Sequence, residues 1–268
     1  MAFTVASVNV NGIRAAIRKG MHGFLEQSRP DIITLQEVRA PDEVLRELLG
    51  DGWFIAHSEC ASKGRAGVAI ASRTSQVSST EGLFNPSGSF NDSGRWVEAV
   101  VESPGGTPIT IISAYVHTGD SSDDARMAEK LAFMDAIIDR VSILRDEGAH
   151  VLLTGDLNVA HREMDIRNWK GNIGKAGFRE DERARLDRLM VELGWVDLGR
   201  ALVGDMEGPY TWWTYRGRAF DNDVGWRIDY QIASPELAET AKDVLVHRAG
   251  SHEERWSDHS PVSVTFNI

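Results

Sequence analysis

The first half of the chain alternates between strand-like and helix-like patterns of hydrophobic and polar residues. Short apolar segments rich in β-formers, separated by Gly, Ser, Asn and Pro, predict strands. Six strands are predicted on this basis, at residues 3–10, 31–36, 53–57, 67–72, 95–101 and 108–115. Apolar residues at helical spacing predict helices at 13–25 and 44–49. The pattern therefore mixes both element types from the start.

The second half contains the clearest helix of the chain. It begins near Ser122, ends at Gly148, and carries one apolar stripe. The stripe consists of Met127, Leu131, Met134, Ile138, Val141 and Leu144. A second helix is predicted at 186–193, and strands are predicted at 151–154, 210–215, 227–233, 243–247 and 262–266. Since no linker or internal repeat interrupts this order, we expect a single domain over residues 1–268, built as an α/β or α+β layered fold.

Composition and charge narrow the possible partners only slightly. The chain is 42% hydrophobic and 26% charged, which is typical of globular domains, and its net charge is −11. A negative net charge argues against a nucleic-acid partner, but residues 161–188 hold eight basic residues against six acidic ones. The only cysteine is Cys60, so no intramolecular disulfide can form and a cytoplasmic location is the default expectation. No apolar run is long enough for a membrane span, so no membrane partner is expected, and a monomer is the default state.

Polar side chains accumulate where the predicted strands end. In the segment Val151 to His161, VLLTGDLNVAH, a buried-type strand is followed by Gly155 and then by Asp156, Asn158 and His161. Asn9, Glu37 and Tyr115 stand at the ends of other predicted strands, Asp229 lies inside one, and Asp258 and His259 come just before the last. Each residue taken singly has an ordinary structural explanation, such as a turn residue or a solvated acid. Strand ends meet at the rim of a packed sheet, however, and there such groups can converge in one pocket.

The residue types in this set suggest a particular chemistry. Carboxylates with neutral amide oxygens are the ligands that Mg²⁺ or Mn²⁺ prefers. The candidate ligands are Asn9, Glu37, Asp156, Asn158 and Asp258. Asp229 and His259 can form an acid–imidazole pair, in which the carboxylate sets the tautomer. No zinc spacing, nucleophile elbow or P-loop occurs in the sequence.

Eight motifs in this order resemble the exonuclease III family of apurinic/apyrimidinic (AP) endonucleases, within the endonuclease/exonuclease/phosphatase superfamily. They are SVNVNGIR, LQEVR, GRAGVAI, GDLNVAH, DIRNWKGN, YTWWTYR, GWRIDY and SDHSPV, and the likeness extends from Phe3 to Phe266. Each motif alone is of modest specificity, whereas eight in the right order are highly specific. The resemblance implies a four-layer α/β sandwich of two packed mixed β-sheets flanked by helices. It also implies Mg²⁺- or Mn²⁺-dependent hydrolysis of a DNA phosphodiester.

The resemblance also implies roles for individual residues. Glu37 corresponds to the principal metal carboxylate, with Asn9 and Asp258 nearby. Asp156 corresponds to the residue that activates the attacking water, with Asn158 beside it. His259, paired with Asp229, and Tyr115 correspond to groups at the scissile phosphate. The DNA-contacting loop and the pocket for a flipped abasic sugar correspond to Asn168, Asn172, Trp212, Trp226 and Ile228.

The sequence departs from the family pattern at three positions. His117 stands where many members have proline in the loop after the tyrosine, and we expect it to replace a phosphate contact there. Asn11 stands where some members have aspartate, and Trp169 replaces a frequent proline.

The predicted function is DNA repair by cleavage 5′ to abasic sites in double-stranded DNA, with 3′→5′ exonuclease and 3′-end-cleaning activity. Two alternatives stay open on sequence alone. One is a phosphoesterase of the same superfamily that acts on a small or lipid substrate, against which the DNA loop and the tryptophan pocket argue. The other is a non-catalytic DNA-binding module, which would usually have lost one of the catalytic residues.

Overall fold

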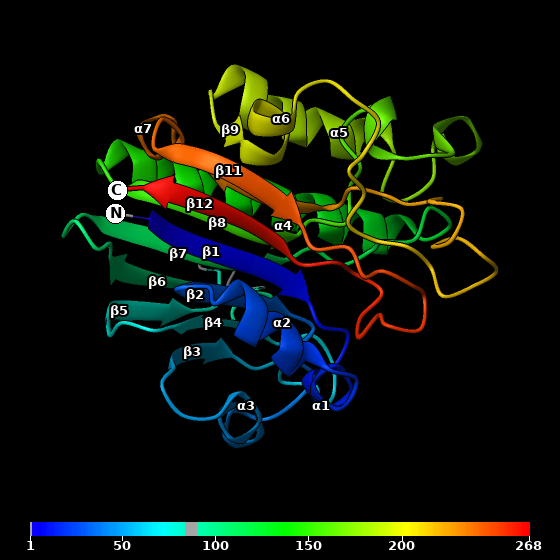
Figure 1. The fold of residues 1–268 in the computed structure, drawn as a ribbon. Helices are drawn as coiled ribbons and strands as arrows, with labels where there is room; N and C mark the ends of the chain where they lie inside the picture. Colours follow the sequence, from blue (N-terminus) through cyan, green and yellow to red (C-terminus); the bar gives the residue numbers. More distant parts are fainter. Residues whose placement is uncertain (1, 84–89) are drawn as a thin grey trace.

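The computed structural model describes residues 2–83 and 90–268, and its strands form two six-stranded sheets. The first sheet contains, in spatial order, β11 (Ala241–Val246), β12 (Val262–Asn267), β1 (Ala2–Asn9), β2 (Ile32–Gln36), β4 (Val68–Ser72) and β3 (Phe54–Ser58). The second contains β5 (Gln76–Glu81), β6 (Trp96–Glu102), β7 (Pro108–Tyr115), β8 (His150–Asp156), β10 (Asp229–Ala233) and β9 (Val196–Asp197). The sheets face each other and helices cover their outer faces (Figure 1). This confirms the four-layer α/β sandwich with mixed sheets.

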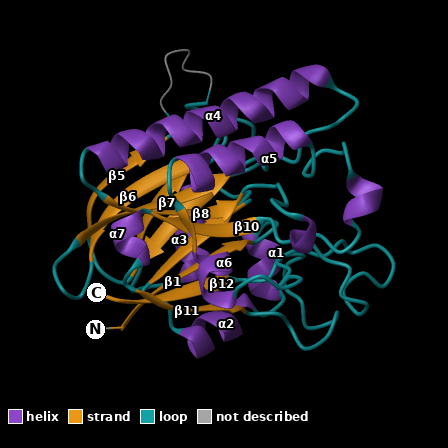
Figure 2. Ribbon diagram, turned by 90° about the horizontal axis from the view of Figure 1, so that it is seen from above, coloured by secondary structure: helices purple, strands orange, loops and turns teal. Residues whose placement is uncertain are grey.

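Helices cover both outer faces of the sandwich. The first sheet packs against α1 (Ile13–Arg18), α2 (Met21–Ser28) and α3 (Asp42–Leu49) through an apolar cluster that includes Ile13, Leu25 and Leu45. The long α4 (Asp124–Asp146) and α5 (Glu180–Asp187) lie side by side on the second sheet (Figure 2). The remaining helices are α6 (Leu198–Val203), α7 (Pro235–Ala238), two 3-10 turns, Glu163–Asp165 and Trp169–Asn172, and a π-helical turn, Arg188–Glu192. None of the helices in the described ranges is long and apolar enough to cross a bilayer.

The space between the sheets is apolar along most of its length and polar at one end. Val5 and Ile111, from opposite sheets, belong to the same buried cluster. Toward the carboxyl ends of β2 and β7, Gln36 Nε2 donates a hydrogen bond to Ser113 Oγ at 3.0 Å. Buried polar groups of this kind must be paired, so they restrict how the two sheets can be aligned.

The strand directions bring the predicted polar residues to one edge of the sandwich. β1 is parallel to β2, and β7 is parallel to β8 with Tyr115 opposite Asp156. β10 runs antiparallel to β8, so its first residue, Asp229, also lies opposite Asp156. β12 runs antiparallel to β1, which places His259, just before β12, beyond the end of β1. This edge lies at the end opposite the chain termini (Figure 1).

Several predicted elements differ from the observed ones. The helix predicted at 13–25 is two helices, because the backbone turns at Gly20 with φ of 110°. The segment 210–215 forms only isolated bridges at Trp212, and β5 and α6 were not predicted. The strand predicted at 151–154 continues through Gly155 to Asp156. In α4 the buried stripe includes Lys130, whose side chain is inaccessible to solvent.

Candidate active site

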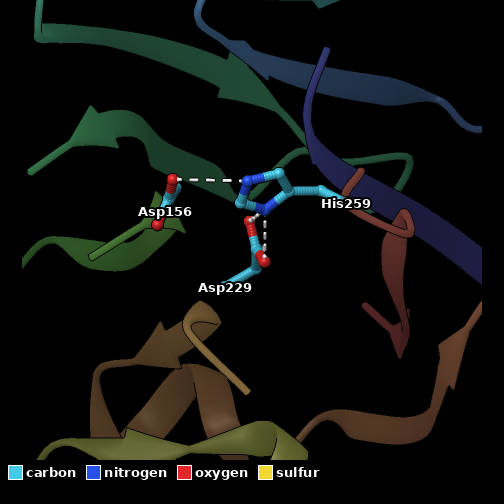
Figure 3. A group of neighbouring side chains, drawn as sticks. All are labelled: Asp156, Asp229 and His259. Carbon is cyan, nitrogen blue, oxygen red and sulfur yellow. Dashed lines mark hydrogen bonds and ion pairs between the residues drawn. The ribbon is translucent and has the colours of Figure 1, made fainter. Parts of the chain in front are cut away.

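A buried chain of two carboxylates and an imidazole lies at the centre of the site. His259 Nδ1 is 2.9 Å from Asp229 Oδ2 and 3.1 Å from Oδ1. On the other side of the ring, Nε2 is 3.8 Å from Asp156 Oδ2. Figure 3 shows the ring between the two carboxylates. The predicted pair of Asp229 and His259 is therefore present in the structure, with Nε2 directed toward Asp156.

The surroundings raise the pKa values of both His259 and Asp156. Burial lowers the pKa of His259, but the Asp229 and Asp156 carboxylates outweigh burial and raise it above its ordinary value. Burial raises the pKa of Asp156; His259 and the hydrogen bond from Asn9 oppose this, and Asp229 adds to it. His259 is therefore a cation at neutral pH. Asp156 is a stronger base than an exposed carboxylate.

Gly155 allows the close strand contact that places Asp156. Its φ is 131°, and a Cβ on this residue would lie 2.0 Å from the carbonyl oxygen of Ala114 on β7. Any side chain would push β8 away from β7. The sequence pattern places this glycine after the strand, whereas the structure shows that it lies within β8 and serves close packing there.

Asn9 joins Asp156 to Glu37. Its Nδ2 donates to Glu37 Oε1 at 2.8 Å and to Asp156 Oδ2 at 2.9 Å, and its side chain is inaccessible to solvent. Glu37 also pairs with Arg39, which was not singled out from the sequence although it belongs to the motif LQEVR. Glu37 has a left-handed backbone with φ of 51°, an unusual conformation for a side-chain-bearing residue that is often found at functional sites.

Asn158 holds the Asp156 carboxylate in place. Its backbone N–H donates to Asp156 Oδ1 at 2.9 Å, and its Nδ2 donates to Oδ2 at 3.0 Å. The same Nδ2 donates to the Val116 carbonyl at 2.8 Å. With both amide hydrogens directed at protein acceptors, Asn158 is suited to positioning Asp156.

Tyr115 contributes a phenol that stays protonated. Burial raises the pKa of its hydroxyl, and the negative charges of Glu37 and Asp156 raise it further. Because the hydroxyl keeps its proton across the physiological range, Tyr115 can act as a hydrogen-bond donor to an anion. Its place at the end of β7, opposite Asp156, agrees with the prediction from sequence.

Asp258 is held by two donors. Asn11 Nδ2 donates to its Oδ1 at 2.8 Å, and Trp212 Nε1 donates to its Oδ2 at 3.1 Å. Trp212 therefore has a polar role that the sequence did not suggest, in addition to the predicted apolar one.

Several of these groups line one cavity of about 430 Å³ that also has apolar lining, whereas Tyr115 lines a neighbouring cavity. Glu37, Asp156, Asn158, Asp258 and His259 line the polar side. The apolar lining is formed by Trp212, Trp226 and Ile228, with the two indole rings edge to face at a centroid distance of 6.1 Å. Asn172 also lines this cavity, whereas Asn168 lines a neighbouring depression that shares Asn172 and Lys175 with it. Of the DNA-binding residues predicted from sequence, only Asn168 lies outside the main cavity.

The donor set fits a divalent cation. Glu37, Asp156 and Asp258 line the cavity and Asp229 lies behind His259, while the cations around them are His259, Arg39 and Lys175. Asp156, Asp229 and His259 also have ligand atoms within 4.8 Å of one another. Asp229 is already paired with the cationic His259, so the carboxylates left for a metal are Glu37, Asp156 and Asp258. Such oxygen ligands match Mg²⁺ and Mn²⁺.

A fully buried ion pair behind the site was not predicted from sequence. Lys130 Nζ lies 2.5 Å from Glu182 Oε1, and neither side chain is accessible to solvent. The same ammonium donates to the carbonyl of Asn158 at 2.8 Å and to that of Thr118 at 3.0 Å. Glu182 in turn accepts from the backbone N–H of Gly177. A lysine one position before the predicted Leu131 gives no signal in the sequence that it points inward.

Fold and site together define a hydrolytic enzyme with paired acid–base groups at the edge of two sheets. The sequence pattern of the Endonuclease/Exonuclease/phosphatase family matches residues 6–259. The chain is 34% identical to an exodeoxyribonuclease of Bacillus subtilis, with 98% of each chain covered. It is 30% identical to the DNA repair nuclease APEX1 of Danio rerio, covering 98% of this chain and 82% of the relative.

Solved structures agree with this assignment. An AP endonuclease from Archaeoglobus fulgidus superposes with a TM-score of 0.85 at 28% identity, over 99% of this chain and 100% of that chain. A 3′ phosphatase from Neisseria, bound to a product DNA hairpin, superposes with a TM-score of 0.84 at 27% identity and the same coverage. The chain belongs to the Endonuclease/Exonuclease/phosphatase family and, within it, to the exonuclease III group of AP endonucleases. It is a nuclease.

Proposed function

We propose that residues 1–268 form one catalytic domain that cleaves the DNA backbone 5′ to abasic sites, with 3′→5′ exonuclease and 3′-end-cleaning activity. One observation carries this proposal. Asp156 and His259, whose ring is held by Asp229, face the same cavity as Trp212 and Trp226. Phosphate chemistry and a pocket for a base-free sugar are thereby combined in one space.

The chemistry at the phosphate follows from the geometry of the polar wall. Asp156, with its raised pKa and fixed orientation, accepts a proton from the attacking water. His259, held cationic by Asp229, donates a hydrogen bond from Nε2 to a non-bridging phosphate oxygen. The protonated Tyr115 hydroxyl donates a second one. Asn158 holds the Asp156 carboxylate in the orientation that this proton transfer requires.

We propose that Mg²⁺ or Mn²⁺ is bound by Glu37 and Asp258, with Asn9, Asp156 and Asn158 as the further ligand groups predicted from sequence. When bound, the cation supplies neutralisation of the negative charge on the phosphate and on the departing oxygen. The three carboxylates Glu37, Asp156 and Asp258, which line one cavity, support this assignment.

Substrate selection rests on the apolar wall and the neighbouring loop. Trp212, Trp226 and Ile228 accept an extruded deoxyribose, and a nucleotide without a base is the cheapest to extrude because no base pair is broken. Asn168 and Asn172 contact the backbone beside it. This wall also argues against a small polar phosphoester as the natural substrate.

We further propose that the enzyme acts as a monomer in the cytoplasm on double-stranded DNA. The support for this compartment is that Cys60 is the single cysteine of the sequence, so no intramolecular disulfide can form.

The test uses a labelled duplex with one tetrahydrofuran abasic analogue, incubated with Mg²⁺, Mn²⁺ or EDTA. We expect a single metal-dependent cut 5′ to the analogue by the native chain and a loss of about 10²- to 10⁴-fold in rate with Asp156→Asn. Lys242→Gln, an exposed change on β11, should cut normally.

Two results would contradict the proposed function. Progressive shortening of an intact duplex, without the single cut, would make exonuclease the main activity. Failure to cleave either duplex with either metal would favour a small phosphoester substrate or a binding role.

A further inference from the structure

We propose that a second, arginine-lined cavity beside the active site binds the phosphate that lies next to the scissile phosphate on its 5′ side. The inference rests on the function proposed above and adds to it a binding site for a specific phosphate of the cleaved strand. The cavity has a volume of about 530 Å³, and four arginines line it: Arg39, Arg65, Arg95 and Arg126.

The position of this cavity relates it to the cleaved strand. It shares Glu37, Arg39 and Thr118 with the active-site cavity, but contains no tryptophan. The two cavities therefore extend to different sides of Glu37. In the proposed reaction the abasic sugar lies 3′ to the scissile phosphate and occupies the tryptophan side. The strand on the 5′ side must then leave in the other direction, into the arginine-lined cavity.

Arg95 offers a hydrogen-bond donor that the protein itself does not use. Its Nη1 atom is buried and has no hydrogen-bond partner among residues 2–83 and 90–268. The guanidinium lies 5.6 Å from the centre of the Tyr115 ring, close to the proposed phosphate chemistry. A buried donor without an acceptor is energetically costly, so such a group is usually completed by a ligand or water. An arginine is suited to a phosphate because its planar fork matches the phosphate oxygens.

His117 adds a second unused donor in the same cavity. Its Nδ1 accepts a hydrogen bond from the Gly119 backbone N–H at 3.1 Å, so in the neutral ring the proton is on Nε2. That Nε2 is buried and has no hydrogen-bond partner within the described residues. Burial, together with Arg95 and nearby cations, lowers the pKa of His117 to about 4, so the ring is neutral at pH 7. His117 thus supplies a neutral N–H donor beside the arginines.

The charge of the cavity favours an anion. Arg65 and Arg126 are exposed and form no ion pair with any residue of the described ranges. Of the acids in the lining, Glu37 is paired with Arg39, while Asp92 and Glu129 are exposed. Glu129 comes only to 4.0 Å from His117 Nε2, beyond hydrogen-bond distance. Three arginines without an ionic partner and a neutral donor therefore remain available for a phosphate.

The test measures DNA binding without metal, so it does not depend on cleavage. A tetrahydrofuran duplex is compared with one in which a neutral methylphosphonate replaces the phosphate on the 5′ side of the scissile one. Affinity is measured by fluorescence anisotropy in EDTA. We expect the native chain to bind the modified duplex about tenfold more weakly, which corresponds to about 1.4 kcal/mol. The Arg95→Gln variant should bind the unmodified duplex about tenfold more weakly than the native chain does. Its affinity for the methylphosphonate duplex should be little lower than its affinity for the unmodified one.

Matched variants separate a phosphate contact from a change in net charge. Lys242→Gln removes the same charge from an exposed strand position and should keep the full response to methylphosphonate. His117→Ala should reduce the response and His117→Gln, which keeps an N–H donor, should restore it. In Arg95→Gln, the slope of the logarithm of the binding constant against the logarithm of the salt concentration should be smaller in magnitude by about one.

The proposal is wrong if Arg95→Gln responds to methylphosphonate as fully as the native chain does. It is equally wrong if the response appears only with methylphosphonate on the 3′ side. A native chain that shows the Arg95-dependent response but never cuts the tetrahydrofuran duplex would contradict the proposed function and leave the phosphate site supported.

Discussion

At the scale of single residues, the site depends on one imidazole held between two carboxylates. Asp229 contacts His259 Nδ1 with both of its oxygens, at 2.9 and 3.1 Å, which fixes the ring and stabilises its positive charge. The other ring nitrogen is thereby directed at Asp156 and the cavity. Loss of the Asp229 charge should therefore affect the reaction more than the fold.

We expect Asp229→Asn to lower kcat by about 10²- to 10⁴-fold while DNA affinity changes little. Removing the carboxylate takes away its charge interaction with the ring, so the pKa of His259 should fall in the variant. Single-turnover kinetics and an NMR titration of His259 in the metal-free protein would measure both effects. An unchanged His259 titration would contradict the assigned ion pair.

Gly155 is the second residue on which the geometry of the site depends. Its backbone φ is 131°, and a Cβ on this residue would lie 2.0 Å from the carbonyl oxygen of Ala114, so no side chain fits there. We expect Gly155→Ala to lower the free energy of unfolding by about 2–5 kcal/mol, because overpacking and backbone strain act together. Gly148→Ala is the matched control, because its positive φ of 81° is comparable but no atom lies within 4 Å of the added Cβ. Urea denaturation of both variants would test this, and equal losses would contradict the packing argument.

At the scale of elements, buried ion pairs attach the loops of the site to the sheets. Asp165, at the end of a 3-10 turn, contacts Arg227 just before β10 at 2.7 Å and Arg200 of α6 at 2.5 Å. Arg227 lies between Trp226 and Ile228, so this network holds the apolar wall of the cavity. Lys130 and Glu182 connect α4 with α5 behind Asn158 in the same way.

The Asp165 network should give the protein an acid-labile component of stability. Burial opposes ionisation of Asp165, but Arg227 and Arg200 outweigh it and lower its pKa to about 2 from 3.8. A lowered folded-state pKa stabilises the protein above the unfolded value and loses that stabilisation as the pH falls through 3.8 toward 2. We expect the stability difference between the native chain and Asp165→Asn to narrow by about 1 kcal/mol between pH 6 and pH 3. Urea denaturation at several pH values would measure it, and a constant difference would contradict the assignment.

At the scale of the whole molecule, two sheets bring together residues that are far apart in the sequence. Asn9 and Asp156 lie 147 positions apart, and Asn11 and Asp258 lie 247 positions apart, yet each pair is hydrogen-bonded. The carboxylates of Glu37, Asp156 and Asp258 meet in one cavity in this way. A divalent cation bound there should therefore stabilise the folded chain as well as support its activity.

We expect Mg²⁺ to raise the melting temperature of the native chain, by an amount that grows with the logarithm of the ratio of free Mg²⁺ to its Kd. At a free Mg²⁺ concentration of about 100 times the Kd, the gain in the free energy of unfolding is about 2.7 kcal/mol. Glu37→Gln should lose most of this gain without DNA present, whereas Glu129→Gln, an exposed change on α4, should keep it. Calorimetry with and without EDTA would test this, and an equal Mg²⁺ response in Glu37→Gln would contradict the proposed ligand.

The sequence by itself determined the layered fold class and most of the strands. Alternation of short apolar segments with an amphipathic helix is a local signal, so it can be recognised without tertiary structure. Polar residues placed directly after strands also predicted which side chains meet at one edge. The eight ordered motifs identified the family and thereby the two packed sheets.

Only the tertiary structure decided the features that depend on contacts between distant segments. The inward direction of Lys130 follows from its partner Glu182, and the split of the first helix follows from the left-handed backbone at Gly20. The two donors of the arginine-lined cavity, Arg95 and His117, are unsatisfied only because of how the sheets and loops pack around them. A sequence records which groups are present, whereas an unpaired buried donor is a property of three-dimensional surroundings.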